Sequence, residues 1–206
     1  MTEDNTVLVV AVLAVIASLA AAGFSYYSLS QGPSIVGFAS TSTGTANLTI
    51  SAVAEINFTT NSINWGTGYV TPTMAQALLN SEGVYTNWTN TTAANVTQPL
   101  VLENIGNNNV SLTLNSSVAS QFIGGTSPSY KLKVTGKAGE AACTVNATYN
   151  FTAYTEITAS EQGACAIFGY LTVADEIEID AQVVVPYNAP PTAKLATIRA
   201  TATVLP

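Results

Sequence analysis

The sequence has no histidine and only two cysteines in 206 residues. Without an imidazole, the chain has no Ser-His-Asp or Cys-His catalytic pair, no His-ligated zinc or copper, and no imidazole general base. Two cysteines alone do not make a metal site. We therefore expect no catalytic residue, no metal and no cofactor, and we expect that the protein is not an enzyme.

Charged side chains are also scarce. They make up 8% of the residues, against about 25% in ordinary soluble domains. The balance of 5 basic and 12 acidic side chains gives a net charge of -7, which disfavours nucleic acid as a partner because nucleic acid selects clusters of Lys and Arg. The three lysines Lys131, Lys133 and Lys137 are interpreted as a solvated strand face. Solubility must come from Ser, Thr and Asn, or from groups attached to them, which favours an extracellular protein.

Residues 7–24, VLVVAVLAVIASLAAAGF, form a long apolar run without a charged residue. As a helix this run is about 27 Å long, close to the thickness of the hydrocarbon core of a bilayer. It is apolar all round, so it must be buried in lipid or among other helices. No helix breaker follows before Gly32-Pro33, so we predict one long N-terminal helix within a domain of residues 1–32. The triplet Ala20-Ala21-Ala22 also resembles a signal-peptidase site, and cleavage there is the alternative.

Small residues recur along this helix at intervals of three and four. Such a stripe lets helix backbones approach closely, although an alanine-rich helix also shows one by chance. Neither flank of the run carries Lys or Arg, which set the topology of a permanent membrane anchor. The residues expected to pack against other copies are Val7, Val10, Ala11, Ala14, Val15, Ser18, Leu19, Ala22 and Ser25.

Beyond Pro33 the sequence changes to short segments in which polar and apolar residues alternate, separated by Gly, Asn, Ser and Pro. This pattern predicts eight or more strands in a head domain of residues 33–206, as an Ig-like β-sandwich with one face of each sheet buried. In 109–115, for example, Val110, Leu112 and Leu114 point inward. A short helix is expected at 74–81. The expected strands lie in 35–39, 47–50, 56–58, 100–102, 109–115, 130–134, 145–153, 167–173, 177–185 and 196–204.

N-glycosylation sequons are the densest motif of the head. An Asn- and Thr-rich chain generates several by chance, but in residues 143–155 the apolar side chains fall on one strand face and Asn146 and Asn150 on the other. Several sites should therefore be accessible and carry covalent N-glycans, which would compensate for the low surface charge. The acceptors are Asn47, Asn57, Asn87, Asn90, Asn95, Asn109, Asn115, Asn146 and Asn150.

Cys143 and Cys165 form an even pair in a domain expected to be exported, which favours a structural disulfide. A plain hairpin that turns near 160–163 would leave the two cysteines far apart. Since Cα atoms more than about 7 Å apart cannot be bridged, the bond requires a different arrangement of the two strands.

An acidic cluster at Asp175, Glu176, Glu178 and Asp180 alternates with isoleucines, which places its last three carboxylates on one strand face. Converging carboxylates can bind calcium, but EF-hand spacing and a turn glycine are missing from this stretch. We favour a solvated outer face over a calcium site.

The apolar helix at 7–24, its polar continuation to Ser30 and the Thr/Asn-rich β-head dense in sequons resemble the archaeal type IV pilin superfamily, which includes adhesion pilins and archaellins. In that family the helix resides in the membrane before assembly and then packs with its neighbours in the filament core, while the head coats the outside. The family's precursors carry a short basic leader immediately before the apolar stretch. Its absence here implies, under this resemblance, a processed chain.

The resemblance implies a structural subunit of an extracellular helical filament, a homopolymer with helices inside and glycosylated heads outside. Repetition of a contact whose rotation does not close also builds a filament on physical grounds. Whether such a filament serves attachment or motility stays open. The alternative is a monomeric, membrane-anchored β-sandwich adhesin or binding module of the cell surface.

Overall fold

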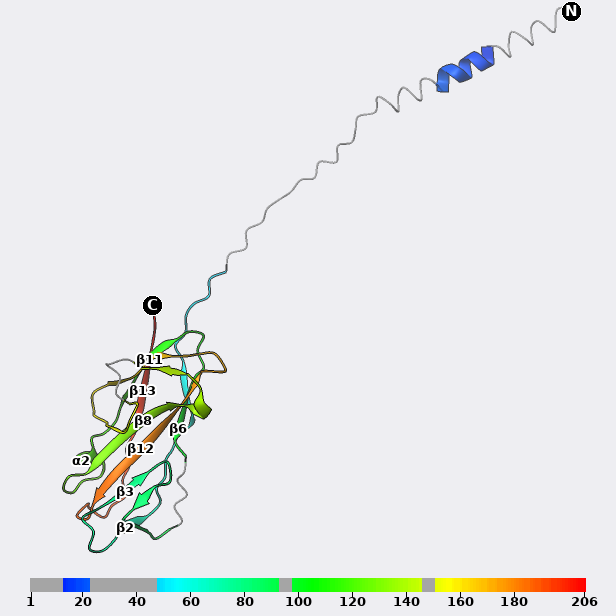
Figure 1. The fold of residues 1–206 in the computed structure, drawn as a ribbon. Coiled ribbons are helices and arrows are strands. Elements are labelled where there is room, and N and C mark those ends of the chain that lie inside the picture. Colours follow the sequence, from blue (N-terminus) through cyan, green and yellow to red (C-terminus); the bar gives the residue numbers. More distant parts are fainter. Residues whose placement is uncertain (1–12, 23–47, 93–97, 146–150) are drawn as a thin grey trace, which may run out of the picture. The chain divides into compact units, whose positions relative to one another are not determined.

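The computed structural model describes residues 13–22, 48–92, 98–145 and 151–206. It divides the chain into two units, Met1–Leu48 and Thr49–Pro206. The structure is mainly β, with antiparallel sheets in the second unit and a short helix at 13–22 in the first (Figure 1). Among the described residues, no helix combines the length and the apolar character needed to cross a bilayer. The rest of the long helix predicted within 1–32 lies outside the described residues.

Strand β12 is the longest and organises the larger sheet, which has seven strands. It pairs with β6 and then β3 along one edge and with β8 along the other, always antiparallel. Strand β1 pairs with β6, β4 with β3, and β10 with β8. The strands are β1 (Ile56–Thr60), β3 (Gln76–Asn80), β4 (Tyr85–Thr86), β6 (Leu100–Asn104), β8 (Ser129–Gly136), β10 (Thr155–Glu156) and β12 (Glu176–Pro186).

The smaller sheet has four strands in the order β13-β7-β11-β9, and all of its pairings are antiparallel. A separate ribbon joins β2 and β5. These strands are β2 (Gly68–Val70), β5 (Trp88–Asn90), β7 (Val110–Asn115), β9 (Cys143–Thr144), β11 (Gln162–Phe168) and β13 (Arg199–Val204). Two short helical turns, α2 (Ala119–Phe122) and η1 (Lys137–Gly139), complete the described elements.

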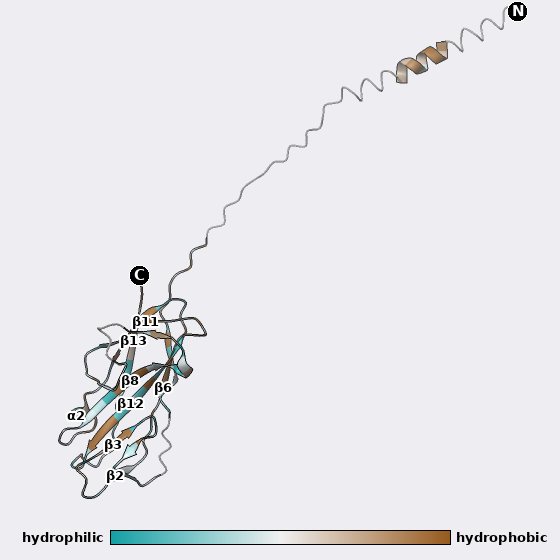
Figure 2. Cartoon of the chain, in the orientation of Figure 1, coloured by the Kyte–Doolittle hydropathy of each residue, from teal (hydrophilic) through white to brown (hydrophobic). Residues whose placement is uncertain are grey.

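Alternation of apolar and polar residues produces the core. Val110, Leu112 and Leu114 of β7 are fully buried, as the sequence predicts, and the residues between them are half-buried. Ile177 and Ile179 of β12 are fully buried as well. Side chains of both sheets belong to one hydrophobic core, and burying one such side chain contributes about 1.5–3 kcal/mol. Apolar residues follow β12 and β3 in Figure 2.

The two ends of the second unit differ. The side-chain amide of Asn104 donates hydrogen bonds to the carbonyl oxygens of Phe168 (3.2 Å) and Asn108 (3.1 Å). The bond to Phe168 links β6 of the larger sheet to β11 of the smaller sheet. It does so at the end of the unit where β1 begins, because Ile56 pairs with Asn104. The smaller sheet runs from this end, where Val110 pairs with Phe168, to the opposite end, where Leu114 pairs with Gln162. Helix α2 follows β7 at that opposite end.

Several predicted elements are wrong. The segment predicted as a helix at 74–81 contains β3, in which Ala77 and Leu79 are buried against the core. Pairing with β12 overrides the helix propensity of its residues. Around 47–50 the structure has no strand among the described residues, and Leu48 and Ile50 are 85% and 76% exposed.

The prediction also fails near the disulfide. In the expected strand 145–153, Val145 and Ala153 are exposed, although Phe151 is fully buried; residues 146–150 lie outside the described part. Strand β11 ends at Phe168, so Leu171 and Val173 are exposed rather than paired. The expected strand at 35–39 also lies outside the described residues. The alternation of apolar and polar residues does not show at which residue a strand stops pairing with its neighbour.

Candidate functional site

The described helix 13–22 presents its apolar side chains to the surroundings. All ten of its residues are exposed, and Leu13, Val15, Ile16 and Leu19 are between 56% and 68% exposed. Figure 2 shows this helix as mainly hydrophobic. Ser18, the one polar residue of the described helix, donates its Oγ hydrogen bond to the carbonyl oxygen of Val15 (2.8 Å), which satisfies the hydroxyl within the helix.

The structure covers part of the predicted packing set. Ala14, Ser18 and Ala22 are spaced four residues apart, which places them on one face of the helix; Val15 and Leu19 lie beside them. The predicted residues Val7, Val10, Ala11 and Ser25 lie outside the described residues.

The described sequons differ in exposure and in the hydrogen bonds of their asparagines. Asn57 and Asn90 are exposed, and no hydrogen bond of their side-chain amides is found among the described residues. Asn87 is exposed but donates to the carbonyl oxygen of Gln76 (3.3 Å), and half-buried Asn115 donates to that of Ala159 (3.3 Å). Asn109 is half-buried. The remaining acceptors, Asn47, Asn95, Asn146 and Asn150, lie outside the described residues.

A disulfide joins Cys143 and Cys165, as predicted, with a Cα–Cα distance of 5.3 Å. The arrangement is not a hairpin between the two cysteines. Strand β9 pairs with β11 in the smaller sheet, whereas β10, which lies between them in the chain, pairs with β8 in the larger sheet. The bond therefore closes a loop that visits both sheets. It is weakly consistent with an extracellular protein.

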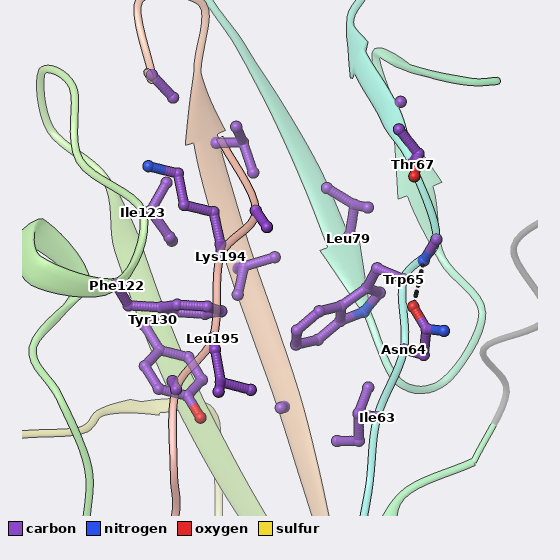
Figure 3. Close-up of a pocket in the computed structure, with 18 of the residues that line it drawn as sticks. Ile63, Asn64, Trp65, Thr67, Leu79, Phe122, Ile123, Tyr130, Lys194 and Leu195 are labelled. Carbon is purple, nitrogen blue, oxygen red and sulfur yellow. Dashed lines mark hydrogen bonds between the residues drawn. The ribbon is translucent and has the colours of Figure 1, made fainter. Parts of the chain in front are cut away.

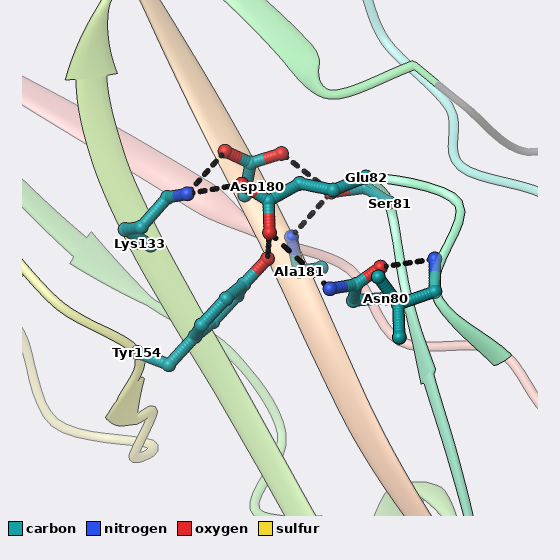
Figure 4. A network of polar contacts seen from close by, with 8 residues as sticks. Asn80, Ser81, Glu82, Lys133, Tyr154, Asp180 and Ala181 are labelled. Carbon is teal, nitrogen blue, oxygen red and sulfur yellow. Dashed lines mark hydrogen bonds and ion pairs between the residues drawn. The ribbon is translucent and has the colours of Figure 1, made fainter. Parts of the chain in front are cut away.

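A polar network connects β8, β12 and the turn between β3 and β4 (Figure 4). The Lys133 Nζ lies 3.3 Å from the Asp180 Oδ2 and also pairs with Glu82. The Ser81 hydroxyl donates to Asp180 (2.7 Å), and the Tyr154 hydroxyl donates to Glu82 (2.9 Å). Lys133 also stacks over the Tyr154 ring, 5.1 Å from its centroid. Every charged group of the network thus has a partner of opposite sign.

The network shifts the pKa values of its members. The hydrogen bond from Lys133 lowers the pKa of Glu82 below its usual 4.5. Partial burial alone would lower the pKa of Lys133, but Glu82 and Asp180 raise it above 10.5 on balance. Burial and the neighbouring carboxylates raise the pKa of Tyr154. Glu82, Lys133 and Tyr154 therefore keep their neutral-pH forms, which suits a structural role better than proton transfer.

The predicted solvated faces are wrong at their most buried members. Asp175 and Asp180 are 7% and 5% exposed, and Lys133 is half-buried. Lys137 does pair at the surface, with Glu176 at 2.7 Å. Within the described ranges, no three Asp, Glu or Cys side chains gather so that they could hold a metal ion. The burial of these side chains depends on which strands are neighbours and on their register, and the sequence of a single strand does not reveal either.

A groove of about 920 Å³ opens over the inner face of the larger sheet (Figure 3). Its floor includes the buried side chains of Leu79, Tyr130 and Val183. One bank is the segment 61–67 with Trp65, and the other is the segment 189–198 with Leu195. Burial raises the pKa of Tyr130 to about 12, so its hydroxyl stays protonated.

Sequence reasoning missed both the groove and most of the network. Glu82, Ser81 and Tyr154 carry no motif, and they meet only because β12 pairs with both β3 and β8 and because β10, which follows Tyr154, pairs with β8. The two banks of the groove lie far apart in the chain. The available signal was the pair of tryptophans, Trp65 and Trp88, since large aromatic side chains often line binding surfaces.

No family model matches the chain, and no curated protein or solved structure matches it either.

Proposed function

We propose that the protein is a structural subunit of an extracellular helical filament, of the kind formed by the archaeal type IV pilin superfamily. The long apolar helix within 1–32 would form the filament core, and an Ig-like β-sandwich head, carrying N-glycans, would coat the outside. Before assembly the helix would be stored in the membrane.

The observation that carries the proposal is the exposure of Leu13, Val15, Ile16 and Leu19 on a helix within an 18-residue run that has no charge. Leaving four such side chains in water is unfavourable by several kcal/mol, at about 25 cal/mol per Å² of apolar surface. They must therefore contact lipid or other protein. A helix with the small residues Ala14, Ser18 and Ala22 on one face can reside in lipid before assembly and can pack closely against other helices afterwards.

The head supports an extracellular location. Its disulfide is of the kind found mostly in oxidising compartments, and its exposed sequons offer attachment points for glycans. Its surface has few charges, so bound sugar would supply the missing hydration. None of these features requires a catalytic site, and the proposal includes no enzymatic activity, cofactor or metal.

Electron microscopy of material sheared from cells that express the chain tests the proposal directly. We expect filaments that contain this chain as the main subunit, with helices inside and heads outside. A deletion of residues 1–30 should release a soluble monomeric head that no longer assembles. A monomeric adhesin would instead leave no filaments in the sheared material, and its head would keep ligand binding after the deletion.

A further inference from the structure

The banks of the groove carry unpaired backbone groups. Within the described part of the chain, the peptide N–H and C=O groups of 61–65 make no hydrogen bond, nor do those of 193–196. Thr197 uses its carbonyl oxygen to accept a bond from the Ser116 hydroxyl (2.9 Å). Because peptide groups alternate in direction along an extended chain, those of Ala196 and Ile198 face the opposite side, away from Ser116.

Both banks continue into strands at the edges of their sheets. The segment 61–65 follows β1, which is the outermost strand of the larger sheet, and 193–198 leads into β13, which is the outermost strand of the smaller sheet among the described residues. An edge strand with free backbone groups is a template for another strand. The groove thus combines a free edge with an apolar floor.

The floor and rim indicate the chemistry of the occupant. Leu79, Tyr130 and Val183 are at most 4% exposed and would pack against apolar side chains. The described residues that line the groove include no Asp or Glu, and Lys194 is their one charged side chain. Arg199 lies at the adjacent start of β13, and neither cation has a carboxylate partner in the described ranges. The rim therefore attracts an acidic partner.

We propose that an extended segment of a second copy of this chain docks in this groove and adds a strand to the free edge of 193–198 and β13. Main-chain hydrogen bonds would hold the segment, and alternate apolar side chains would enter the groove. A second copy fits the charge, because the chain carries -7 overall while the rim is cationic. A rigid small molecule would leave the bank's peptide groups unpaired.

The inference concerns contacts between heads, so it goes beyond the proposed packing of helices. It holds for any assembly in which heads meet at high local concentration. Its test is arranged to run on the full chain in detergent, without filaments, so that the two proposals can fail separately.

The first test places a photo-cross-linking amino acid at Leu195 and, as a matched control, at Leu171. Leu195 and Leu171 are both exposed, at 88% and 58%, but they lie near opposite ends of the smaller sheet. Leu195 shortly precedes the start of β13, and Leu171 lies in the loop that follows β11. Isotope-labelled and unlabelled full-length chains are mixed in detergent, irradiated and analysed by mass spectrometry.

We expect cross-links between labelled and unlabelled copies at position 195, with a yield at least about fivefold above that at position 171, since docking holds the partner within reach. Cross-links confined to a single copy would overturn the proposal, because the chain's own segment would then occupy the groove. Cross-links to attached sugar, or equal yields at both positions, would overturn it as well.

The second test uses Ala196→Pro, which removes an N–H that makes no hydrogen bond within the described residues and blocks strand addition. Thr172→Pro, in the exposed loop after β11, is the control. The thermal midpoint of each variant reports whether the head still folds. We expect Ala196→Pro to reduce mixed cross-linking from Leu195 at least about fivefold and Thr172→Pro to leave it unchanged; unchanged cross-linking in a folded Ala196→Pro chain would overturn the proposal.

Discussion

Lys133 and Asp180 lie directly opposite each other on the antiparallel strands β8 and β12, with the Nζ and Oδ2 atoms 3.3 Å apart. The Asp180 side chain is 7% exposed, so its charge depends on this partner and on the Ser81 hydroxyl. A buried charge that loses its partner is strongly destabilising.

Lys133→Ala should therefore lower the free energy of unfolding by about 3 kcal/mol, measured by urea denaturation. Adding Asp180→Asn to Lys133→Ala should restore part of this loss, because the buried charge is then gone. Lys137→Ala is the control, since this lysine side chain is 38% exposed and its carboxylate partner Glu176 is far less buried than Asp180, so the unfolding midpoint should barely change. Equal losses for the two lysine variants would contradict the assigned burial.

The same network predicts how stability depends on pH. The folded-state pKa of Glu82 is depressed below 4.5, so its contribution is complete above pH 4.5 and disappears as the pH falls through the folded value. The pKa of Lys133 is raised above 10.5, so its contribution is complete below pH 10.5 and disappears as the pH rises through the folded value. Urea midpoints of the wild type should fall at both extremes. A Lys133→Ala variant should show a smaller relative loss in acid; an identical acid profile would refute the coupling.

Removing the disulfide with Cys143→Ser and Cys165→Ser should destabilise the head by about 3 kcal/mol, because the unfolded chain regains the freedom of a loop that spans 22 positions. Denaturation of the oxidised, reduced and double-serine proteins measures this difference. The reduced wild type should match the double variant. If the oxidised protein were no more stable than the reduced one, the bond would have no structural role.

Glycan occupancy should follow the freedom of each acceptor amide. We expect glycan on the exposed residues Asn57 and Asn90, and little on Asn115, which is half-buried and bonded to Ala159. Mass spectrometry of glycopeptides from native material checks this order. Asn57→Gln should remove the mass of one glycan, whereas Asn115→Gln should leave the mass of attached glycan unchanged. Bare peptides at both Asn57 and Asn90 would exclude the glycan coat.

The small-residue face of the helix provides the last prediction. Ser18→Asp places a charge between Ala14 and Ala22 and should abolish filaments, since a carboxylate in an apolar interface is costly. Ser18→Ala, which removes only a hydroxyl already bonded to Val15, should leave filaments intact. Electron microscopy and membrane extraction of each variant distinguish failed assembly from failed expression. Normal filaments from Ser18→Asp would exclude this face from the core.

Strand pairing could be predicted where burial follows local alternation. Val110, Leu112 and Leu114 have the predicted direction, and the disulfide with its non-hairpin arrangement was also predicted. The strand β3 was missed because its residues favour helix in isolation, and pairing with β12 decides otherwise.

The network and the groove could not be predicted, because both depend on sheet order. Asp180 belongs to an alternating acidic run that is typical of a solvated face, yet β8 and the turn after β3 cover it. Trp65 and Leu195 are separated by most of the head in sequence and line one groove only in the folded chain.

The disulfide also determines how the head responds to tension. The loop between Cys143 and Cys165 spans 22 positions, and it runs from the smaller sheet to β10 in the larger sheet and back to the smaller sheet. When the chain is pulled from its ends, these residues bear no load while the bond is intact, because force passes directly from Cys143 to Cys165. At about 3.3–3.6 Å per residue, this shortens the extensible chain by roughly 70–80 Å. Under reducing conditions the head should therefore stretch further before it breaks.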